Sequence, residues 1–337
     1  MQELLGLVLV SFAVTAFLIV PFIDLLFFLK KKFEKKEDTD KLETHALTPI
    51  HDQLMKADEA TPSGGGILLI FVLVTISSIA AFMLPLIELT PLKILLFTLV
   101  SFGGLGLVDD IRWLTTKRKG KLLGLGRKLL LVIQTILALI IGSLLYFNLG
   151  IQNINIPGLD NFIIGWMFIP LSAFIIVSFA NAYNISDGLD GLSTGLLMIC
   201  LFAFLVLAHS VFNDTLSVFV GVWIGVLIAY LYFNVYPARI YLGDAGAFGF
   251  GATLAVVGLM TGKIVGLAII GGVYIFIILS SLIQIFAKKF LKRKIFPVAP
   301  LHMYLKYLGW QEPKIVARFW LAGIIFAIFG LWLSLLN

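Results

Sequence analysis

The sequence predicts an all-α membrane protein with about ten transmembrane helices and both chain termini outside the cell. Of the 337 residues, 60% are apolar and only 13% are charged, whereas soluble domains have about 45–50% and about 25%. The mean hydropathy is +1.04. The apolar residues form long runs, and the basic residues gather in alternate connections between them. These properties exclude a water-soluble enzyme, a nucleic-acid-binding domain, a disordered chain and a secreted disulfide scaffold, and the single Cys200 cannot form an internal disulfide.

Each predicted helix corresponds to one apolar run, because a membrane-spanning helix needs about 20 apolar residues. The first run is not expected to be a cleavable signal peptide, since Glu3 replaces a basic leader and Lys30 follows a run that is too long. We expect all the runs to belong to one integral membrane domain over residues 1–337. The runs cover residues 4–29, 66–87, 91–108, 129–147, 162–182, 189–208, 215–234, 245–261, 264–287 and 315–336.

The distribution of basic residues predicts how the chain crosses the membrane. If the N-terminus is outside, 23 of the 25 Lys and Arg residues fall in cytoplasmic connections, and Lys93 and Lys263 are the exceptions. Such a bias is the usual sign of the cytoplasmic side. The net charge of +6 is therefore expected to face anionic lipid head groups, and no nucleic acid is needed to explain it.

One outer connection is predicted to form a short β-hairpin. The segment from Gly150 to Gly158 roughly alternates apolar and polar residues between its two glycines, which is typical of short paired strands.

The acidic residues provide the first functional signal. Asp109 and Asp110 end the third run, Asp187 and Asp190 open the sixth, and Asp244 opens the eighth. In the predicted topology all five lie at the cytoplasmic rim. Neighbouring carboxylates repel one another and are costly to bury, so a cation is expected among them. Mg²⁺ suits such oxygen ligands and usually takes one or two carboxylates plus phosphates. The alternative for the Asp109–Asp110 pair is that it merely ends a helix among the lipid head groups.

The segment Asn184-Ile185-Ser186-Asp187-Gly188-Leu189-Asp190-Gly191 is the most specific motif. Ser186 or Asp187 would cap a helix well, and acids suit the first turn of a helix. Capping alone does not call for an asparagine, two acids three residues apart and two glycines together. The spacing predicts both carboxylates on one helix face, with the glycines admitting another backbone or a ligand.

Two further helix entrances on the same side are rich in glycine. Tyr241-Leu242-Gly243-Asp244-Ala245-Gly246 again places a carboxylate at a helix start between glycines. Thr61-Pro62-Ser63-Gly64-Gly65-Gly66 opens the second run, and its backbone amides are candidates to hold an anion, although a flexible helix entrance explains the glycines equally well.

Among the histidines, His302 is the candidate for chemistry. It lies in Pro300-Leu301-His302 on a basic cytoplasmic connection. An imidazole there could hold a phosphate or donate a proton, and the alternative is a loop histidine with no such role.

Together these motifs resemble the polyprenyl-phosphate hexosamine-1-phosphate transferase superfamily, and most of all its phospho-N-acetylmuramoyl-pentapeptide transferase branch. The resemblance covers nearly the whole chain. It implies ten spans, a homodimer, and transfer of a phospho-sugar from a UDP donor to undecaprenyl phosphate with Mg²⁺, giving lipid I and UMP in a bacterial inner membrane. The stretches that favour this branch are Ala299-Pro300-Leu301-His302, Leu308-Gly309-Trp310-Gln311-Glu312-Pro313-Lys314 and Arg318-Phe319-Trp320.

The resemblance also assigns roles to residues at matching positions. Asp244 matches the metal-binding aspartate, and Asp109 and Asp110 match an essential pair, of which Asp109 would deprotonate or position the lipid phosphate. His302 is grouped with this pair as a catalytic residue. The expected substrate-binding residues are Asn184, Asp187 and Asp190 in the nucleotide motif, Tyr241 against the uracil, Lys128 near the diphosphate, and Lys56 before the Thr61-Pro62 motif.

One departure from the family pattern leaves the donor sugar open. The family has three consecutive histidines before Phe-Glu, whereas this chain has His302-Met303-Tyr304-Leu305-Lys306. Only the first histidine is retained, and a lysine replaces the acid.

Two alternatives therefore remain at this point. A sister transferase would use UDP-N-acetylglucosamine with the same lipid. A transporter would need carboxylates near the middle of the bilayer, but no Asp or Glu falls in the middle of a run, and even Asp24 is close to the cytoplasmic end of the first.

Overall fold

The computed structural model describes residues 2–34, 61–117, 125–157, 162–211 and 213–336. Ten helices within these residues are long and apolar enough to cross a membrane, so the predicted fold class is confirmed. The elements are α1 (Gln2–Glu34), α3 (Gly65–Met83), α4 (Leu89–Lys117), α5 (Arg127–Leu149), β1 (Asn153–Ile154), β2 (Phe162–Ile163), η2 (Gly165–Met167), α6 (Phe168–Ser186), α7 (Leu192–Ser210), α8 (Asp214–Asn234), α9 (Gly243–Met260), α10 (Ile264–Ile270), α11 (Gly272–Phe286), η3 (Ala287–Leu291), α12 (Leu301–Tyr307) and α13 (Glu312–Leu335).

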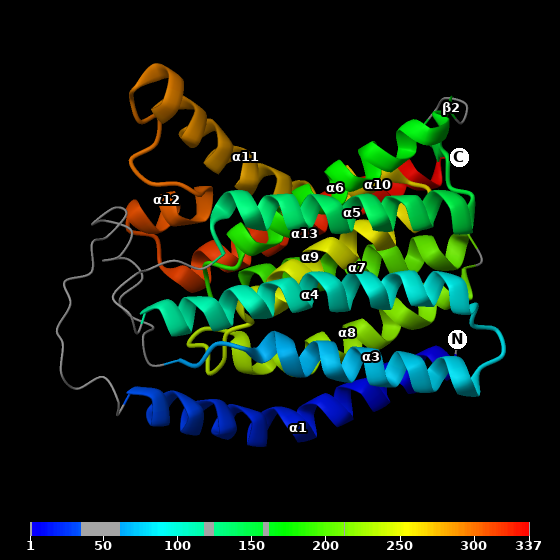
Figure 1. Cartoon of the computed structure of the whole chain (residues 1–337), viewed down its shortest axis with the longest axis horizontal. Helices are drawn as coiled ribbons and strands as arrows, with labels where there is room; N and C mark the ends of the chain where they lie inside the picture. The colour runs from blue at the N-terminus through cyan, green and yellow to red at the C-terminus, as the bar shows by residue number, and fades with distance from the viewer. Residues whose placement is uncertain (1, 35–60, 118–124, 158–161, 212, 337) are drawn as a thin grey trace.

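The long helices lie roughly side by side, and the two ends of the bundle differ (Figure 1). One end carries both chain termini and the β-hairpin, and the other carries α12 (Figure 1). Both termini therefore lie on the same side, as an even number of crossings requires.

Helix α9 forms the centre of the bundle and is the most buried of the ten spans. It packs mainly against α4 and α6, and also contacts α3. Small residues make this approach close: a Cβ atom on Gly66 would lie 2.4 Å from the Gly246 Cα atom, and one on Gly106 would lie 2.1 Å from the Asp244 carbonyl oxygen. Glycine is common where membrane helices approach closely, and here it brings α3 and α4 onto the first turns of α9.

The predicted single span over 264–287 is wrong, because the chain divides at Gly271 into α10 and α11. A Cβ atom on Gly271 would lie 2.5 Å from the ring of Phe179, and one on Gly272 would lie 2.9 Å from the ring of Phe326. The two aromatic rings thus fill the space beside the break. Helix α11 then leans away from the bundle toward the end that carries α12 (Figure 1).

The third helix is longer than expected. The prediction ended it at residue 108, but α4 continues to Lys117. Asp109 and Asp110 consequently lie within the helix and do not end it.

The hairpin is confirmed, with a correction to its second strand. Asn153 pairs with Ile163 and Ile154 with Phe162 in antiparallel register. The second strand therefore follows Gly158, which lies outside the described residues. Lys263, one of the two basic residues expected on the outer side, donates a hydrogen bond from Nζ to Oδ1 of Asn155 at 3.2 Å.

Candidate active site

The predicted site residues gather where several helices begin or end at one rim of the bundle. Asp109 and Asp110 lie near the end of α4, Asp187 and Asp190 lie between α6 and α7, and Asp244 lies in the first turn of α9. This is the rim that also carries α12, opposite the chain termini (Figure 1).

Asp110 joins α4 to the start of α9. Its Oδ1 atom accepts a hydrogen bond from the Asp244 amide at 3.3 Å, and its Oδ2 atom accepts one from the Ala245 amide at 3.2 Å. The first amides of a helix lack partners within the helix and carry partial positive charge. Asp110 therefore caps α9 from a different helix and fixes the position of Asp244.

Asp244 lies among polar groups from two other helices. Nδ2 of Asn184, in α6, donates to its Oδ1 atom at 2.8 Å. The carboxyl group of Asp109 is close enough to act on that of Asp244, and neighbouring carboxyl groups repel one another unless a proton or a cation lies between them. The structure thus joins three of the predicted residues, Asp109, Asn184 and Asp244, in one cluster.

Asp187 belongs to the same electrostatic cluster. The pKa of its carboxyl is raised from 3.8 to about 6, mainly by burial and in addition by the charges of Asp244 and Asp190, while the Ser193 hydroxyl that donates to it acts in the opposite direction. A carboxyl that titrates close to neutral pH in a polar cluster is a frequent property of a functional site.

Neither Ser186 nor Asp187 caps the start of a helix. Asp187 ends α6, and α7 begins only at Leu192, after Gly191 with φ of 74°. Residues 187–190 thus form a turn, and the predicted common helix face of the two acids does not exist. Only a glycine adopts this backbone angle without strain, which accounts for Gly191.

Asp190 makes contacts of a different kind. It is only 5% exposed, and its Oδ2 atom accepts from the Ala238 amide at 2.7 Å. Its own amide donates to Oε1 of Glu312 at 2.9 Å, and Oε2 of Glu312 pairs with Nζ of Lys306 at 2.9 Å. These contacts tie the turn to the loop before α9 and to the start of α13, and substrate contact by Asp190 stays a prediction.

His302 lies against the same turn. The side chain is 1% exposed, and a Cβ atom on Gly188 would lie 2.7 Å from its Nε2 atom. Gly188 thus makes room for the imidazole of a helix that is more than a hundred residues away in the sequence. The structure therefore brings the one retained histidine to the acidic cluster.

The glycine-rich entrance to α3 does not offer its amides to an anion. Gly64 and Gly65 donate to the Tyr241 carbonyl at 3.1 and 2.9 Å, and Gly66 donates to the Leu242 carbonyl at 2.8 Å. The Tyr241 amide donates to the Pro62 carbonyl at 2.9 Å. Backbone pairing uses these amides, which argues against the candidate anion site, and it holds the half-buried Tyr241 beside α3.

Of the two basic residues predicted to bind substrate, Lys128 and Lys56, the structure describes only Lys128. Lys128 is exposed in the first turn of α5. The Leu125 amide donates to Oδ1 of Asp109, so the start of α5 is attached to the acidic cluster. Lys56 lies outside the described residues.

The donor set of the cluster fits a magnesium ion that shares its coordination with a substrate. Among the described residues, no three His, Cys, Asp or Glu side chains form a complete metal site. Mg²⁺ does not require one, because it usually takes one or two carboxylates, with waters and substrate phosphates completing the octahedron. Asp244 and Asp109, whose carboxyl groups act on one another, would supply such a pair of hard oxygen ligands.

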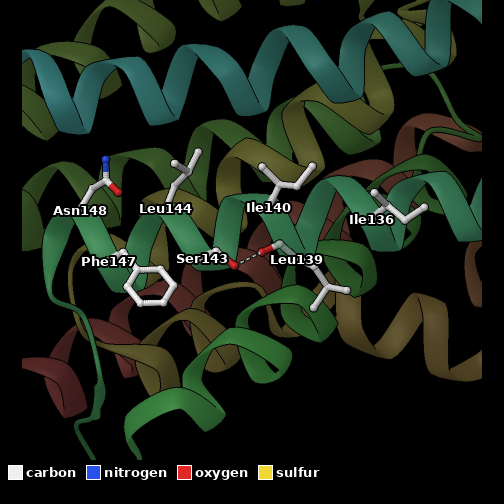
Figure 2. Close-up of a pocket in the computed structure, with 7 residues that line it drawn as sticks. All are labelled: Ile136, Leu139, Ile140, Ser143, Leu144, Phe147 and Asn148. Carbon is white, nitrogen blue, oxygen red and sulfur yellow. Dashed lines mark hydrogen bonds between the residues drawn. The ribbon is translucent and has the colours of Figure 1, made fainter.

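A hollow of about 380 Å³ lies elsewhere, along α5 between Ile136 and Asn148 (Figure 2). Apolar side chains line most of it, and Ile136 and Phe147 are exposed. The Ser143 hydroxyl donates to the Leu139 carbonyl of its own helix at 2.8 Å. The hollow therefore faces lipid and contributes no group to the acidic cluster.

Sequence reasoning missed Ser193, Glu312 and Lys306 as parts of the site. Ser193 comes six residues after Asp187 and contacts it because α7 begins late. Glu312 carried no signal of its own, since an acid in the first turn of a helix is ordinary.

Comparisons with known proteins agree with the geometry. The family model described as glycosyl transferase family 4 matches residues 92–262. A phospho-N-acetylmuramoyl-pentapeptide-transferase of Bacillus pumilus is 34% identical over 278 residues, which are 81% of this chain and 84% of that protein. One from Oceanobacillus iheyensis is 35% identical with the same two coverages, and one from Pelagibacter ubique is 38% identical over 70% of each chain. The family match contains the whole acidic cluster from Asp109 to Asp244.

Proposed function

This chain belongs to glycosyl transferase family 4 and is a multi-pass membrane transferase, and from this we propose that it transfers phospho-N-acetylmuramoyl-pentapeptide from its UDP donor to undecaprenyl phosphate. The products are lipid I and UMP. An oxygen of the lipid phosphate attacks the phosphorus that is bonded to the sugar, and the bond from that phosphorus to UMP breaks.

The observation that carries the proposal is the meeting of Asp109, Asp110 and Asp187 around Asp244. These residues come from three separated segments and lie at one rim of the bundle. A lipid phosphate reaches such a rim while its chain stays in the hydrocarbon. A transporter would require acids near the middle of the bilayer, and these acids lie at one rim of the bundle.

The contacts support the following roles in the reaction. Asp244 and Asp109 would hold Mg²⁺, which supplies charge compensation for the donor diphosphate and the leaving UMP. Asp110 holds Asp244 in place through the first amides of α9. Asp109, the acid nearest to the start of α5, positions or deprotonates the lipid phosphate.

The proposed location is the bacterial inner membrane, with the site on the cytoplasmic side. The basic residues support this orientation, because Lys306, Lys314 and Arg318 lie at the rim of the acidic cluster, whereas Lys263 lies beside the hairpin at the opposite end. UDP-activated sugars are made in the cytoplasm, so the donor reaches the site without crossing the membrane. A homodimer, as the family resemblance implies, stays a prediction.

The donor sugar is tested by measuring UMP release from the purified protein in vesicles with undecaprenyl phosphate. UDP-N-acetylmuramoyl-pentapeptide is expected to release UMP, and UDP-N-acetylglucosamine is not. The relatives' names favour the first donor. Release from the second donor alone would assign the chain to the sister activity.

The metal-binding role is tested with a pair of matched variants. Asp244→Asn is expected to abolish UMP release without unfolding the protein. Asp214→Asn is the control, because Asp214 also lies in the first turn of a helix, α8, but at the opposite rim. Retained activity in Asp244→Asn would remove the metal assignment.

A further inference from the structure

Glu312 belongs to a polar chain that joins five segments of the same rim. Nζ of Lys306, in α12, contacts Oε2 of Glu312 at 2.9 Å. Oε1 of Glu312 accepts from the Asp190 amide at 2.9 Å, and Oδ2 of Asp190 accepts from the Ala238 amide at 2.7 Å. The Ala238 carbonyl accepts from the Thr61 hydroxyl at 3.1 Å. The chain thus runs from α12 to the segment before α3.

The groups in this chain are shielded from solvent. The Lys306 and Glu312 side chains are 18% and 9% exposed, and Asp190 is 5% exposed. A buried carboxylate is costly unless it is paired and hydrogen-bonded, and here Lys306 supplies the opposite charge. An acid in the first turn of α13 also suits the helix dipole, but the dipole does not account for the contact with the Asp190 amide.

The turn held by Glu312 carries a site carboxylate. Asp187 comes three residues before Asp190, and its carboxyl accepts from Ser193 at the start of α7. The carbonyl of Ser193 in turn accepts from the Tyr274 hydroxyl at 2.6 Å. The turn is therefore fixed on one side by α7 and α11, and on the other side by Glu312.

We infer that Glu312, with its charge balanced by Lys306, is a positioning residue that holds the 187–190 turn in the geometry needed to bind the UDP donor. Its carboxylate acts as the acceptor for the Asp190 amide, and Lys306 makes it possible for that carboxylate to be buried and charged. This inference rests on the proposed function for its kinetic consequence.

Two variants distinguish a Glu312 that accepts from the Asp190 amide from a Glu312 that only forms an ion pair between α12 and α13. Glu312→Gln keeps an oxygen acceptor for the Asp190 amide and loses the ion pair. The charge exchange Lys306→Glu with Glu312→Lys restores an ion pair, but a lysine has no acceptor. Lys314→Met is the control, because Lys314 is an exposed lysine on the same helix end.

The first measurement is hydrogen exchange of the Asp190 amide in the purified protein without substrate. We expect exchange to be at least about tenfold faster in the charge-exchange variant than in the wild type, and within about threefold of the wild type in Glu312→Gln and Lys314→Met. Equal protection in the charge-exchange variant and the wild type would overturn the inference, and so would loss of protection in Glu312→Gln as large as that in the charge-exchange variant.

The second measurement is kinetic and separates the two substrates. In the charge-exchange variant, kcat/KM for the UDP donor is expected to fall at least about tenfold, while KM for undecaprenyl phosphate changes less than about threefold. An equal effect on both substrates, or full activity in this variant, would contradict a role at the donor turn. If the wild type releases UMP from neither donor, the proposed function fails, and the exchange experiment still decides whether Glu312 holds the turn.

Discussion

Replacing Gly106 by alanine tests whether the close approach of α4 and α9 assembles the site. A Cβ atom at this position would lie 2.1 Å from the Asp244 carbonyl oxygen and 2.6 Å from the Ala245 amide nitrogen, whereas ordinary contact begins at 3.4 Å. Both neighbours are backbone atoms, so the clash cannot be relieved by rotating a side chain. Because the protein interior is closely packed, α4 and α9 must separate by about 1 Å to admit the Cβ atom.

This separation acts directly on the acidic cluster. Asp109 and Asp110 follow Gly106 by three and four residues on α4, and both contact the first turn of α9. Overpacking of this kind destabilises a protein by about 1–3 kcal/mol. A displacement of about 1 Å at reacting groups lowers the rate about 100-fold. We therefore expect Gly106→Ala to lose about 100-fold in kcat and to unfold at a lower temperature.

The assay is UMP release in vesicles, with thermal unfolding measured in parallel. Gly104→Ala is the matched control, because Gly104 lies on the same helix and a Cβ atom there would meet nothing within 4 Å. Wild-type kinetics and stability in Gly106→Ala, indistinguishable from those of Gly104→Ala, would refute the reasoning.

Three further predictions concern other contacts of the rim. Asp110→Ala removes the cap of α9 and should lower the free energy of unfolding by about 1–2 kcal/mol, and Asp110→Asn should lower it less. Denaturant titration in detergent measures both changes. Greater stability in Asp110→Ala than in the wild type would mean that repulsion from Asp244 outweighs the cap. The folded-state pKa of Asp187, about 6 against 3.8, means that the folded protein binds a proton more strongly than the unfolded chain between these values. Asp187 therefore lowers the free energy of unfolding by about 3 kcal/mol as the pH rises through that window. Thermal unfolding of Asp187→Asn, measured in Mg²⁺-free buffer, should lack this decrease. The same pH dependence in Asp187→Asn as in the wild type would contradict the raised pKa of Asp187. The Gln284 side chain accepts hydrogen bonds from the Ile295 and Phe296 amides at 3.1 and 3.0 Å. Gln284→Leu removes these hydrogen bonds and should speed tryptic cleavage within residues 288–294. An unchanged cleavage rate would show that the two hydrogen bonds do not hold this segment.

The membrane topology could be predicted from the sequence because its determinants are local. Apolar length and the bias of basic residues do not depend on how the helices pack, and the described helices agree with the predicted runs except near residue 271 and at the end of α4, which continues to Lys117. The start of α9 was predicted for the same reason, since Gly243 and Asp244 mark it in the sequence itself.

The contacts within the site depend on packing and carried no such signal. Asp110 looks like an ordinary helix-end acid until α9 lies beside it. The amides of Gly64 to Gly66 looked available because their partners, Tyr241 and Leu242, are about 175 residues away in the sequence. The break at Gly271 depends on rings from two other helices, Phe179 and Phe326.

The central claim is that carboxylates from separated segments bind one divalent cation at the cytoplasmic rim. Electron paramagnetic resonance of Mn²⁺, used in place of Mg²⁺, measures this directly in purified protein with the UDP donor present. We expect one bound Mn²⁺ per chain in the wild type and in Asp214→Asn, and at least about tenfold weaker binding in Asp244→Asn. Equal Mn²⁺ affinity in Asp244→Asn and Asp214→Asn would contradict it.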